Sequence, residues 1–264
     1  MIVPTIGRPE SLALLLRDLH ASPVPIESVI VVADGVAQPI RGRLSDLVRD
    51  GISIIDLPTR QGAAAARNAA ARTVDAGLLC FLDDDVRLSD SWADALRQAL
   101  ESEWECFTGP VTSTELGTLA VAREDRYLRR YAGLAAGQYV NFLAGGNSVI
   151  SVPLFRAAGE FPLVRVGSDS AIISAIETVG AACRFAPRLV VSHTHDRGWR
   201  VALDSAYRSG WTSTHGVLAG EFRSLVCNRP KQPMRVRLIN LVFLLAKSGG
   251  CLLSDLGRPA GSEA

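Results

Sequence analysis

The apolar residues of the first hundred positions follow two periods, one helical and one typical of buried strands. After Pro9, leucines recur at i, i+3, i+4 and i+7, the spacing of one face of a helix with proline in its first turn. These leucines are Leu12, Leu15, Leu16 and Leu19. Runs dominated by apolar residues at 29–32, 52–57 and 78–82 predict strands buried on both faces.

Helical segments separate these strands. We expect a short helix at 42–48 and an alanine-rich helix from Gly62 through residue 76. Strands that alternate with helices predict βαβ units and a mainly parallel sheet, which makes the chain an α/β protein. Ligands bind such sheets beyond the carboxyl ends of the strands. The polar residues expected at those ends are Thr5, Asp34 and Asp83 to Asp85.

The regular alternation stops after residue 104. A glycine-rich segment, Ala144-Gly145-Gly146-Asn147, interrupts the second half of the chain. The elements expected around it are a strand up to residue 112, helices at 123–131 and from Asp169, strands at 182–186 and 189–192, and mostly helical structure from residue 200.

Length and charge divide the chain unevenly. With 264 residues the chain is near the upper limit for one hydrophobic core, so we expect one domain at 1–196, with halves that meet at residue 112, and a basic helical extension at 197–264. The net charge is +1, but residues 197–247 carry nine Lys and Arg against two Asp and Glu. This asymmetry predicts an acidic, metal-binding front and a tail that contacts an anionic partner, although a solvated basic face gives the same pattern.

Composition and cysteine spacing exclude several classes of protein. Hydrophobic residues make up 48% and charged residues 21% of the chain, which excludes a disordered or fibrous protein. Five cysteines without C-x-x-C spacing favour neither a disulfide framework nor a zinc site. The first residues do not resemble a signal peptide, and the longest apolar stretch, at 238–246, is too short to span a bilayer. We therefore expect a cytoplasmic protein.

Three consecutive carboxylates, Asp83, Asp84 and Asp85, follow the third predicted strand. They would repel one another without a cation or strong hydrogen-bond donors nearby. In extended backbone, Asp83 and Asp85 share one face and Asp84 points the other way. Such oxygen ligands suit Mg²⁺ or Mn²⁺, and a cation here could neutralise a leaving diphosphate. The alternative is an acidic turn that caps a helix beginning near Ser89.

Four short motifs occur in the order and spacing of family 2 glycosyltransferases. They are Val3-Pro4-Thr5, Val32-Ala33-Asp34-Gly35, Gly62-Ala63-Ala64-Ala65-Ala66-Arg67-Asn68 and Phe81-Leu82-Asp83-Asp84-Asp85. Gly145-Gly146-Asn147 and Ser168-Asp169 follow them. About the first 195 residues therefore resemble a GT-A type glycosyltransferase of family 2, a Rossmann-like enzyme that uses a nucleoside-diphosphate sugar. The first strand is shorter than is usual in this family, so either the strand is short or the protein begins upstream.

The resemblance implies which residues bind the donor. Residues 1–112 would form the nucleotide-sugar-binding half and residues 113–196 the acceptor and catalytic half. Pro4, Thr5 and Arg8 lie in the expected nucleotide loop, and Asp34 resembles the acid that binds the base or ribose. Arg67 resembles the basic residue near the nucleotide, and a helix N-terminus with an arginine is a reasonable anion site. An ordinary exposed helix arginine is the alternative.

The resemblance also implies a metal and sugar site. Asp83 and Asp85 match the D-x-D motif and are the implied metal ligands, with Asp85 as the more direct one. Asp83 and Asp84 are also implied to contact the donor. His193 or His195 could add an imidazole ligand, and His193 is the better candidate. Mn²⁺ tolerates such a nitrogen ligand better than Mg²⁺ does. Residues Gly145 and Gly146 resemble the stretch that lines the sugar pocket, where a missing Cβ lets backbone approach the substrate, and a plain tight turn is the alternative.

Asp169 resembles the general base that takes the proton of the acceptor hydroxyl. The family commonly has an acid where this chain has Ser168, so the role of base depends on Asp169 alone. The alternative is an acid that caps the N-terminus of the helix that follows.

The basic and apolar segment at 235–245 leaves three interpretations open. It could lie in a membrane interface and bring the site to a lipid-linked acceptor, pack on the core, or form a dimer contact. The acceptor, a glycan, lipid-linked compound or small molecule, is not indicated by any motif, and no nucleic-acid partner is expected.

We expect a metal-dependent transfer of one sugar per encounter, with inversion at the anomeric carbon and a UDP-sugar as the favoured donor. Inversion is the usual course of the family, and residues 197–200 do not match the Q/R-x-x-R-W pattern of processive members. Two rival functions remain. One is a nucleotidyltransferase, although residues 5–9 lack the Gly-rich signature of that class. The other is a catalytically silent protein that binds a nucleotide sugar.

Overall fold

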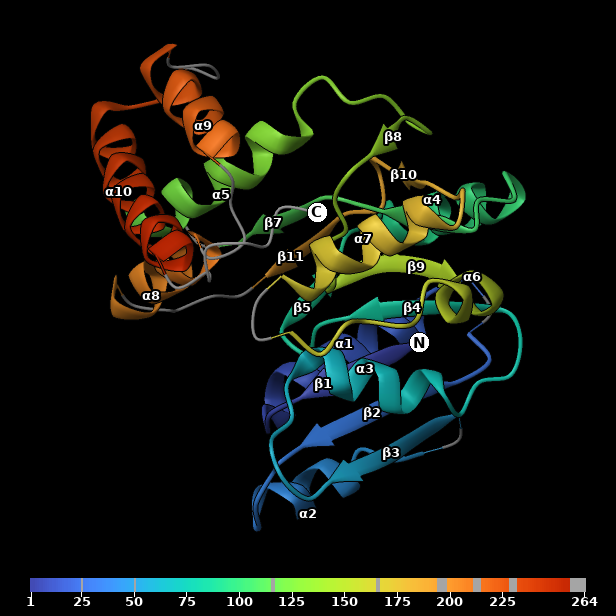
Figure 1. Cartoon of the computed structure of the whole chain (residues 1–264). Helices are drawn as coiled ribbons and strands as arrows, with labels where there is room; N and C mark the ends of the chain where they lie inside the picture. Colours follow the sequence, from blue (N-terminus) through green and yellow to red (C-terminus); the bar gives the residue numbers. More distant parts are fainter. Residues whose placement is uncertain are drawn as a thin grey trace. The chain divides into compact units, whose positions relative to one another are not determined.

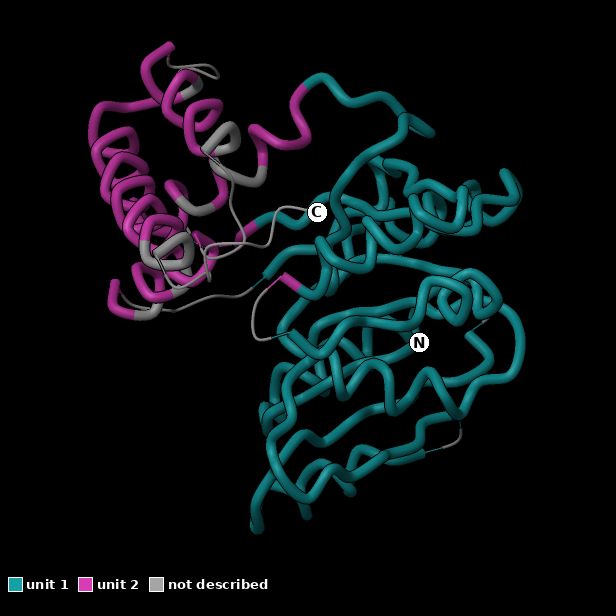
Figure 2. The backbone as a smooth tube through the Cα atoms, viewed as in Figure 1, with its two compact units in different colours: residues 1–112, 133–164, 168–194 teal, residues 113–132, 165–167, 195–264 magenta. Residues whose placement is uncertain are grey.

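The chain divides into two units (Figure 2). The computed structural model describes residues 1–24, 26–49, 51–114, 117–164, 167–193, 199–210, 215–227 and 232–256. Unit 1 comprises residues 1–112, 133–164 and 168–194, and unit 2 comprises residues 113–132, 165–167 and 195–264.

Unit 1 is built on a sheet whose first four strands run parallel (Figure 1). In sheet order these strands are β3 (Ile52–Leu57), β2 (Val29–Asp34), β1 (Ile2–Thr5) and β4 (Leu78–Leu82). All six residues of β2 are buried, as expected for a strand covered on both faces. Because the strands are parallel, their carboxyl ends, with Thr5, Asp34 and the residues after Leu82, lie at one edge of the sheet.

The rest of the sheet is mixed. Among the described residues four more strands complete it, in the order β9 (Asn147–Ser151), β6 (Cys106–Thr108), β10 (Cys183–Phe185) and β8 (Tyr139–Val140). Strand β9 is antiparallel to both β4 and β6, β10 is parallel to β6, and β8 is antiparallel to β10. The predicted α/β class with a mixed, mainly parallel sheet is confirmed.

A small second sheet lies in the order β5 (Val86–Leu88), β11 (Val191–His193) and β7 (Val111–Ser113). Strands β11 and β5 are antiparallel, and their register pairs His193 with Val86. This pairing brings a histidine from late in the chain next to the residue that follows Asp85.

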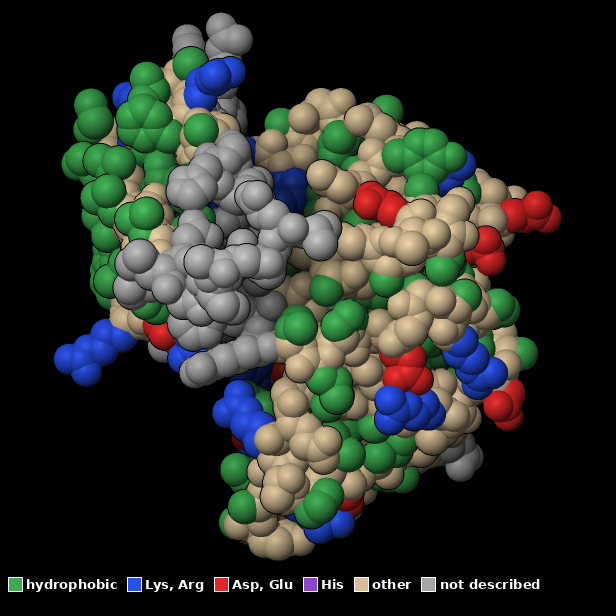
Figure 3. All heavy atoms as spheres, in the orientation of Figure 1, with side chains coloured by type: hydrophobic (Ala, Val, Ile, Leu, Met, Phe, Trp, Pro, Cys, Tyr) green, Lys and Arg blue, Asp and Glu red, His purple; other side chains and the backbone are tan. Residues whose placement is uncertain are grey.

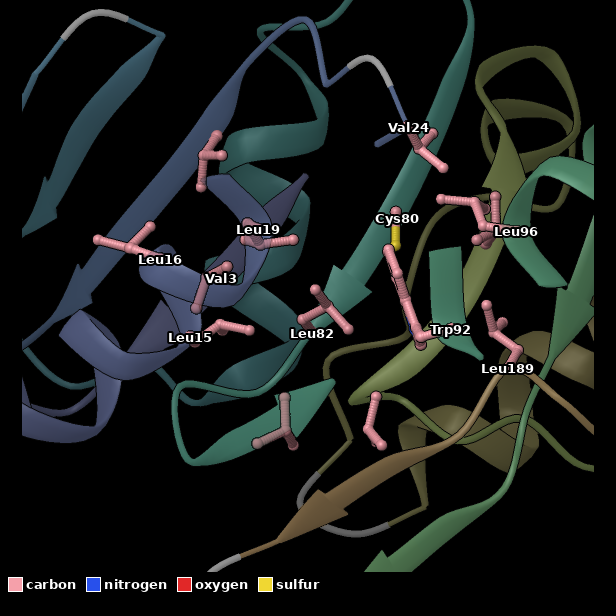
Figure 4. Packing of buried hydrophobic residues seen from close by; sticks show 14 of the residues in the cluster. Val3, Leu15, Leu16, Leu19, Val24, Cys80, Leu82, Trp92, Leu96 and Leu189 are labelled. Atoms are coloured by element: carbon pink, nitrogen blue, oxygen red, sulfur yellow. The ribbon is translucent and has the colours of Figure 1, made fainter. Parts of the chain in front are cut away.

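Helices cover the sheet of unit 1 and bury its apolar positions. They are α1 (Pro9–Ala21), α2 (Ile40–Ser45), α3 (Ala63–Ala71), α4 (Trp92–Glu101), α6 (Val152–Ala157) and α7 (Ser168–Thr178). The leucines of α1 are buried in one core with Val3 of β1, Leu82 of β4 and Trp92 of α4 (Figure 4). Each fully buried leucine stabilises the fold by about 1.5–3 kcal/mol relative to an exposed one.

The described secondary structure of unit 2 consists of helices, apart from the last residue of β7. Its helices are α5 (Thr118–Tyr131), α8 (Trp199–Gly210), α9 (His215–Cys227) and α10 (Met234–Leu256). Small residues let α10 approach its neighbours: Ala122 of α5 and Ala202 and Ala206 of α8 are buried in one core with Phe243. Asp125 of α5 is buried as well and accepts a hydrogen bond of 2.8 Å from the Asn240 side chain. No described helix is long and apolar enough to cross a membrane.

Several predicted boundaries are wrong. The alanine-rich helix ends at Ala71 and not at residue 76, since the chain turns through Arg72 toward Gly77, whose φ is +91°. Strand β5 lies between the acidic triplet and α4, which begins at Trp92 and not near Ser89. Pro4 and Thr5 belong to β1 and not to the loop that follows it. The β1–β4 pairing includes only Ile2 and Phe81, as expected because Pro4 has no N–H with which to extend the ladder.

Candidate active site

The three carboxylates after β4 have different surroundings. The predicted alternation of side chains required extended backbone at these residues. Asp83, Asp84 and Asp85 instead lie in the turn between β4 and β5. The structure nevertheless brings Asp83 and Asp85 together on one side and turns Asp84 into the protein. All described residues of this site belong to unit 1.

Asp84 holds the loop after β1. Its carboxylate accepts a hydrogen bond of 2.5 Å from the Thr5 hydroxyl and one of 2.8 Å from the Arg8 guanidinium. Burial raises the pKa of Asp84, whereas the Thr5 hydrogen bond and the Arg8 charge lower it. Arg8 also donates a hydrogen bond of 2.7 Å to Asp85, so one guanidinium joins two neighbouring carboxylates. Asp84, Thr5 and Arg8 thus form a single network beneath the turn.

Asp83, Asp85 and His193 converge. Each offers one ligand atom, and these atoms lie within 4.8 Å of one another. His193 Nδ1 lies 3.0 Å from Asp85 Oδ1, and His193 Nε2 lies 3.7 Å from Asp83 Oδ2. The β5–β11 register produces this arrangement, because it places His193 beside Val86. The residues predicted as metal ligands are therefore neighbours in the fold.

This donor set fits a divalent cation. Two carboxylates and one imidazole supply charge and a nitrogen ligand, a combination that suits Mn²⁺ better than Mg²⁺. The three residues leave coordination positions for water or phosphate oxygens, since such ions take six ligands. Asp83 and His193 retain partial exposure, so the cluster opens to solvent.

Arg67 lies between the carboxylates and is not an exposed helix arginine. It is 4% exposed, donates a hydrogen bond of 2.8 Å to Asp83, and lies 3.6 Å from Asp169. Its guanidinium carbon is 5.5 Å from the centre of the Phe161 ring, a cation–π distance. Its Nε atom is buried without a hydrogen-bond partner among the described residues. A buried arginine that faces two acids links the two sides of the site.

The two glycines after residue 144 approach the acidic side chains closely. A Cβ on Gly145 would lie 2.6 Å from Asp169 Oδ1, and a Cβ on Gly146 would collide with the Asp83 carboxylate. Real Cβ atoms do not tolerate such distances, so glycine is required at both positions if the two acids keep their places. This packing gives the glycines a role in the site beyond a plain tight turn.

Asp169 lies in the first turn of α7 and faces the same site. The residues packed around Asp169 displace water from its carboxyl group, and this desolvation raises the pKa of Asp169, while the Arg67 charge and the Gly145 backbone N–H lower it. Even so, 40% of the side-chain surface stays exposed, which leaves room for a substrate to reach it. Because α7 begins at Ser168, Asp169 lies within the helix and is not its N-terminal cap. A reachable carboxylate with a raised pKa is suited to accept a proton.

Asp34 has protein partners of its own. Its two carboxylate oxygens accept hydrogen bonds from the backbone N–H groups of Gln61, at 2.6 Å, and Gly62, at 2.8 Å. Asp34 is buried and fixes the turn that begins α3, the helix carrying Arg67. Pro4 is buried in β1 and lies opposite Val32 in the parallel β1–β2 register. The donor contacts implied by the family resemblance, including those of Asp34, Pro4 and Arg67, stay predictions.

Asn68 and Asn147 support the site, although the sequence motifs that contain them do not indicate this role. Asn68 exchanges two hydrogen bonds with the Phe161 backbone, of 2.8 and 3.0 Å, and so holds the ring that faces Arg67. The side-chain amide of Asn147 donates to the carbonyls of Pro110 and Leu189 and ties three segments together behind Gly146. In the sequence, only their positions next to Arg67 and Gly146 point to this role, because the hydrogen-bond partners of both asparagines lie in distant segments of the chain. His195 lies outside the described residues.

Sequence comparison assigns the first part of the chain to one family. The profile described as "Glycosyl transferase family 2" matches residues 1–158, which is more than half of the chain. A search of curated protein sequences finds no match.

Solved structures with a similar fold are glycosyltransferases. Mannosyltransferase PcManGT from Pyrobaculum calidifontis, in complex with GDP-Man and Mn²⁺, has a TM-score of 0.61 and 16% identity, covering 98% of this chain and 75% of that one. GalNAc-T7 with UDP, GalNAc and Mn²⁺ has a TM-score of 0.58 and 14% identity. The match covers 74% of this chain and 42% of that one. S. aureus TarS in complex with UDP-GlcNAc has a TM-score of 0.57 and 17% identity. The match covers 75% of this chain and 58% of that one. At these identities the likeness establishes the fold, which is that of GT-A enzymes. The chain spans less than two thirds of the last two proteins.

Proposed function

Since the chain belongs to glycosyl transferase family 2, we propose that it transfers one sugar at a time from a nucleoside-diphosphate sugar to an acceptor hydroxyl, with inversion at the anomeric carbon. The observation that carries this proposal is the convergence of Asp83, Asp85 and His193 within 4.8 Å. On the other side of Arg67 lies Asp169, a carboxylate with a raised pKa. A cluster of side chains that can bind one cation, beside a carboxylate that can act as a base, is the arrangement that such a transfer needs.

Asp83, Asp85 and His193 would hold the divalent cation, which we propose to be Mn²⁺. The presence of Mn²⁺ with GDP-Man and with UDP in two structures of similar fold supports this assignment. When bound, the cation would neutralise negative charge on the leaving nucleoside diphosphate. Mg²⁺ is the alternative ion, and the imidazole ligand disfavours it.

Asp169 is the proposed general base. The proton of the acceptor hydroxyl would move to the Asp169 carboxylate while the hydroxyl oxygen attacks the anomeric carbon and the bond to the diphosphate breaks. A base contributes about 10²–10⁴-fold to such a step. Arg67 would position both Asp169 and Asp83, since it contacts the two carboxylates from a buried place.

The nucleotide is proposed to bind at the carboxyl ends of β1 and β2. Thr5 is the last residue of β1, Arg8 lies in the loop after it, and Asp34 is the last residue of β2. The sugar is proposed to lie against Gly145 and Gly146, whose missing Cβ atoms let their backbone approach the acids. A UDP-sugar is the favoured donor, and GDP-sugars are the next to test because a GDP-Man complex has a similar fold.

Thermal stabilisation by ligands tests the donor site. The protein would be heated with UDP, GDP and their sugars, with and without Mn²⁺, because a ligand that binds only the folded state raises the melting temperature. We expect a Mn²⁺-dependent rise with one nucleoside diphosphate, lost in Asp85→Ala. Asp94→Ala, an exposed acid on α4 that pairs with Arg97, is the matched control and should retain the rise.

Donor turnover separates an enzyme from a silent binder. Release of the nucleoside diphosphate from the stabilising donor should be measurable and should fall in Asp169→Asn without loss of donor binding. A folded protein that binds the donor but releases no diphosphate with any acceptor tested would support the silent nucleotide-sugar-binding protein instead.

A further inference from the structure

The outward face of α10 is apolar along most of its length. Leu238, Leu245 and Leu252 lie seven residues apart on one side of the helix and are 56%, 64% and 57% exposed. Met234 and Val242 lie on the same side and are exposed too. We call these five residues the α10 stripe. Figure 3 shows hydrophobic side chains gathered over α10 and α9.

The α10 stripe contains no charge. Between Arg237 and Asp255 the sequence has a single charged residue, Lys247, and Lys247 is buried and paired with Glu221 at 2.5 Å. The inner side of α10 is already covered, because Val236 and Phe243 are buried against α5 and α8. The stripe is therefore not the core-facing side of the helix. A continuous exposed apolar surface of this kind marks an interaction site.

Helix α9 extends the apolar surface. Phe222 and Val226 are 53% and 58% exposed on one side of α9. The two helices pack together through the Lys247–Glu221 pair and a hydrogen bond of 3.3 Å from Arg237 to the Leu225 carbonyl. Apolar residues from two packed helices thus contribute to one side of unit 2.

Basic residues border this surface. Arg223, next to Phe222, and Arg235, next to Met234, are exposed. By sequence, unit 2 carries 15 Lys and Arg against 8 Asp and Glu, whereas unit 1 carries 13 against 19. Apolar side chains bordered by arginines match the chemistry of a lipid headgroup layer, where acyl chains lie behind anionic phosphates.

We propose that the α10 stripe, with Phe222 and Val226, docks on the surface of an anionic lipid bilayer. Helix α10 would lie in the plane of the interface, since no described helix is long and apolar enough to cross a membrane. A second copy of the chain fits less well, because it would bring two surfaces of net positive charge together. Bilayer docking goes beyond sugar transfer, and it needs no donor or metal.

Vesicle sedimentation tests the docking surface. The full chain would be mixed with phosphatidylcholine vesicles that contain no anionic lipid or about 30% phosphatidylglycerol. We expect binding to the anionic vesicles, weaker binding in about 0.5 M NaCl, and an affinity lower by about tenfold or more in Leu238→Asp/Leu245→Asp. Arg223→Glu/Arg235→Glu should lose the preference for anionic lipid. Because vesicle binding requires no turnover, a failure here leaves the proposed transferase activity untouched.

The matched control is Val48→Asp/Val179→Asp, which places two aspartates at exposed apolar positions of unit 1. It should bind vesicles like the unchanged protein, and melting temperatures verify that every variant folds. Equal binding by the Leu238→Asp/Leu245→Asp variant, or no binding by the unchanged protein, would overturn the proposal. Light scattering adds one more outcome: a dimer that this variant converts to monomers, without vesicle binding, would assign the stripe to a second copy of the chain.

Discussion

Asp83 and Asp84 are adjacent in sequence, yet they contact different parts of the protein. Asp84 is buried against Thr5 and Arg8, whereas Asp83 faces Arg67 and His193. The family motif could predict that this triplet carries chemistry, but it could not assign the partners of each acid. Those partners come from β1, α3 and β11, which only the fold brings together.

We expect that substitution of Arg67 greatly lowers the activity and hardly weakens donor binding. Arg67→Lys should lower kcat about 10²-fold, because a single ammonium cannot contact Asp83 and Asp169 at once and a displaced base slows the reaction. Steady-state kinetics with saturating Mn²⁺ measure the split between kcat and KM. Arg72→Lys is the control, since Arg72 lies five residues later, is exposed and pairs with Glu160 at the surface. Equal losses in the two variants would contradict the positioning role of Arg67.

The raised pKa of Asp169 has a consequence for the pH profile. A base must be deprotonated to act, and a pKa above the ordinary value of about 4 keeps Asp169 protonated to higher pH. We therefore expect kcat to fall on acidification through a midpoint above that value, measured with Mn²⁺ held saturating. Asp169→Asn should lower kcat about 10²–10⁴-fold and remove this limb of the profile. A profile with the same acidic limb in Asp169→Asn would assign the limb to another group.

At the scale of elements, Gly145 and Gly146, which precede β9, let the carboxylates of Asp169 and Asp83 lie close to the backbone. Gly146→Ala should weaken Mn²⁺ binding, because the added Cβ collides with the Asp83 carboxylate and must displace it. Mn²⁺ titration followed by the melting temperature measures the change, which we expect to be about tenfold or more. Gly117→Ala is the control, since nothing lies within 4 Å of a Cβ at Gly117. Unchanged Mn²⁺ affinity in Gly146→Ala would remove Asp83 from the ligand set.

The elements that could be predicted from the sequence are those with a strong local signal. The leucines of α1 and the buried run of β2 gave correct positions, because a helix face and a strand covered on both sides leave periodic or continuous apolar patterns. Strand β5 has three residues and pairs with β11, about a hundred residues later, so no local pattern reveals it. His193 was a candidate from its place after a strand, but its distance to Asp85 depends on that pairing.

At the scale of the whole molecule, the contacts between residues divide the chain differently from its sequence pattern. The sequence pattern places a boundary between residues 196 and 197. The contacts instead group residues 113–132 with the helices after residue 195. Helix α5 explains this grouping, because its Asp125 and Ala122 are buried against α10 and the core of unit 2.

Truncation distinguishes the two divisions. A chain ending at residue 196 keeps α5 but loses α8, α9 and α10, so Asp125 and the apolar side of α5 lose their covering helices. Buried polar groups that lose their partners and exposed apolar surface both favour aggregation, so we expect this chain to be insoluble or to melt at a lower temperature. A chain ending at Leu256 keeps every described helix and is the matched control. If the chain of 196 residues instead melts like the control, α5 does not depend on α10, and the boundary read from the sequence is the physical one.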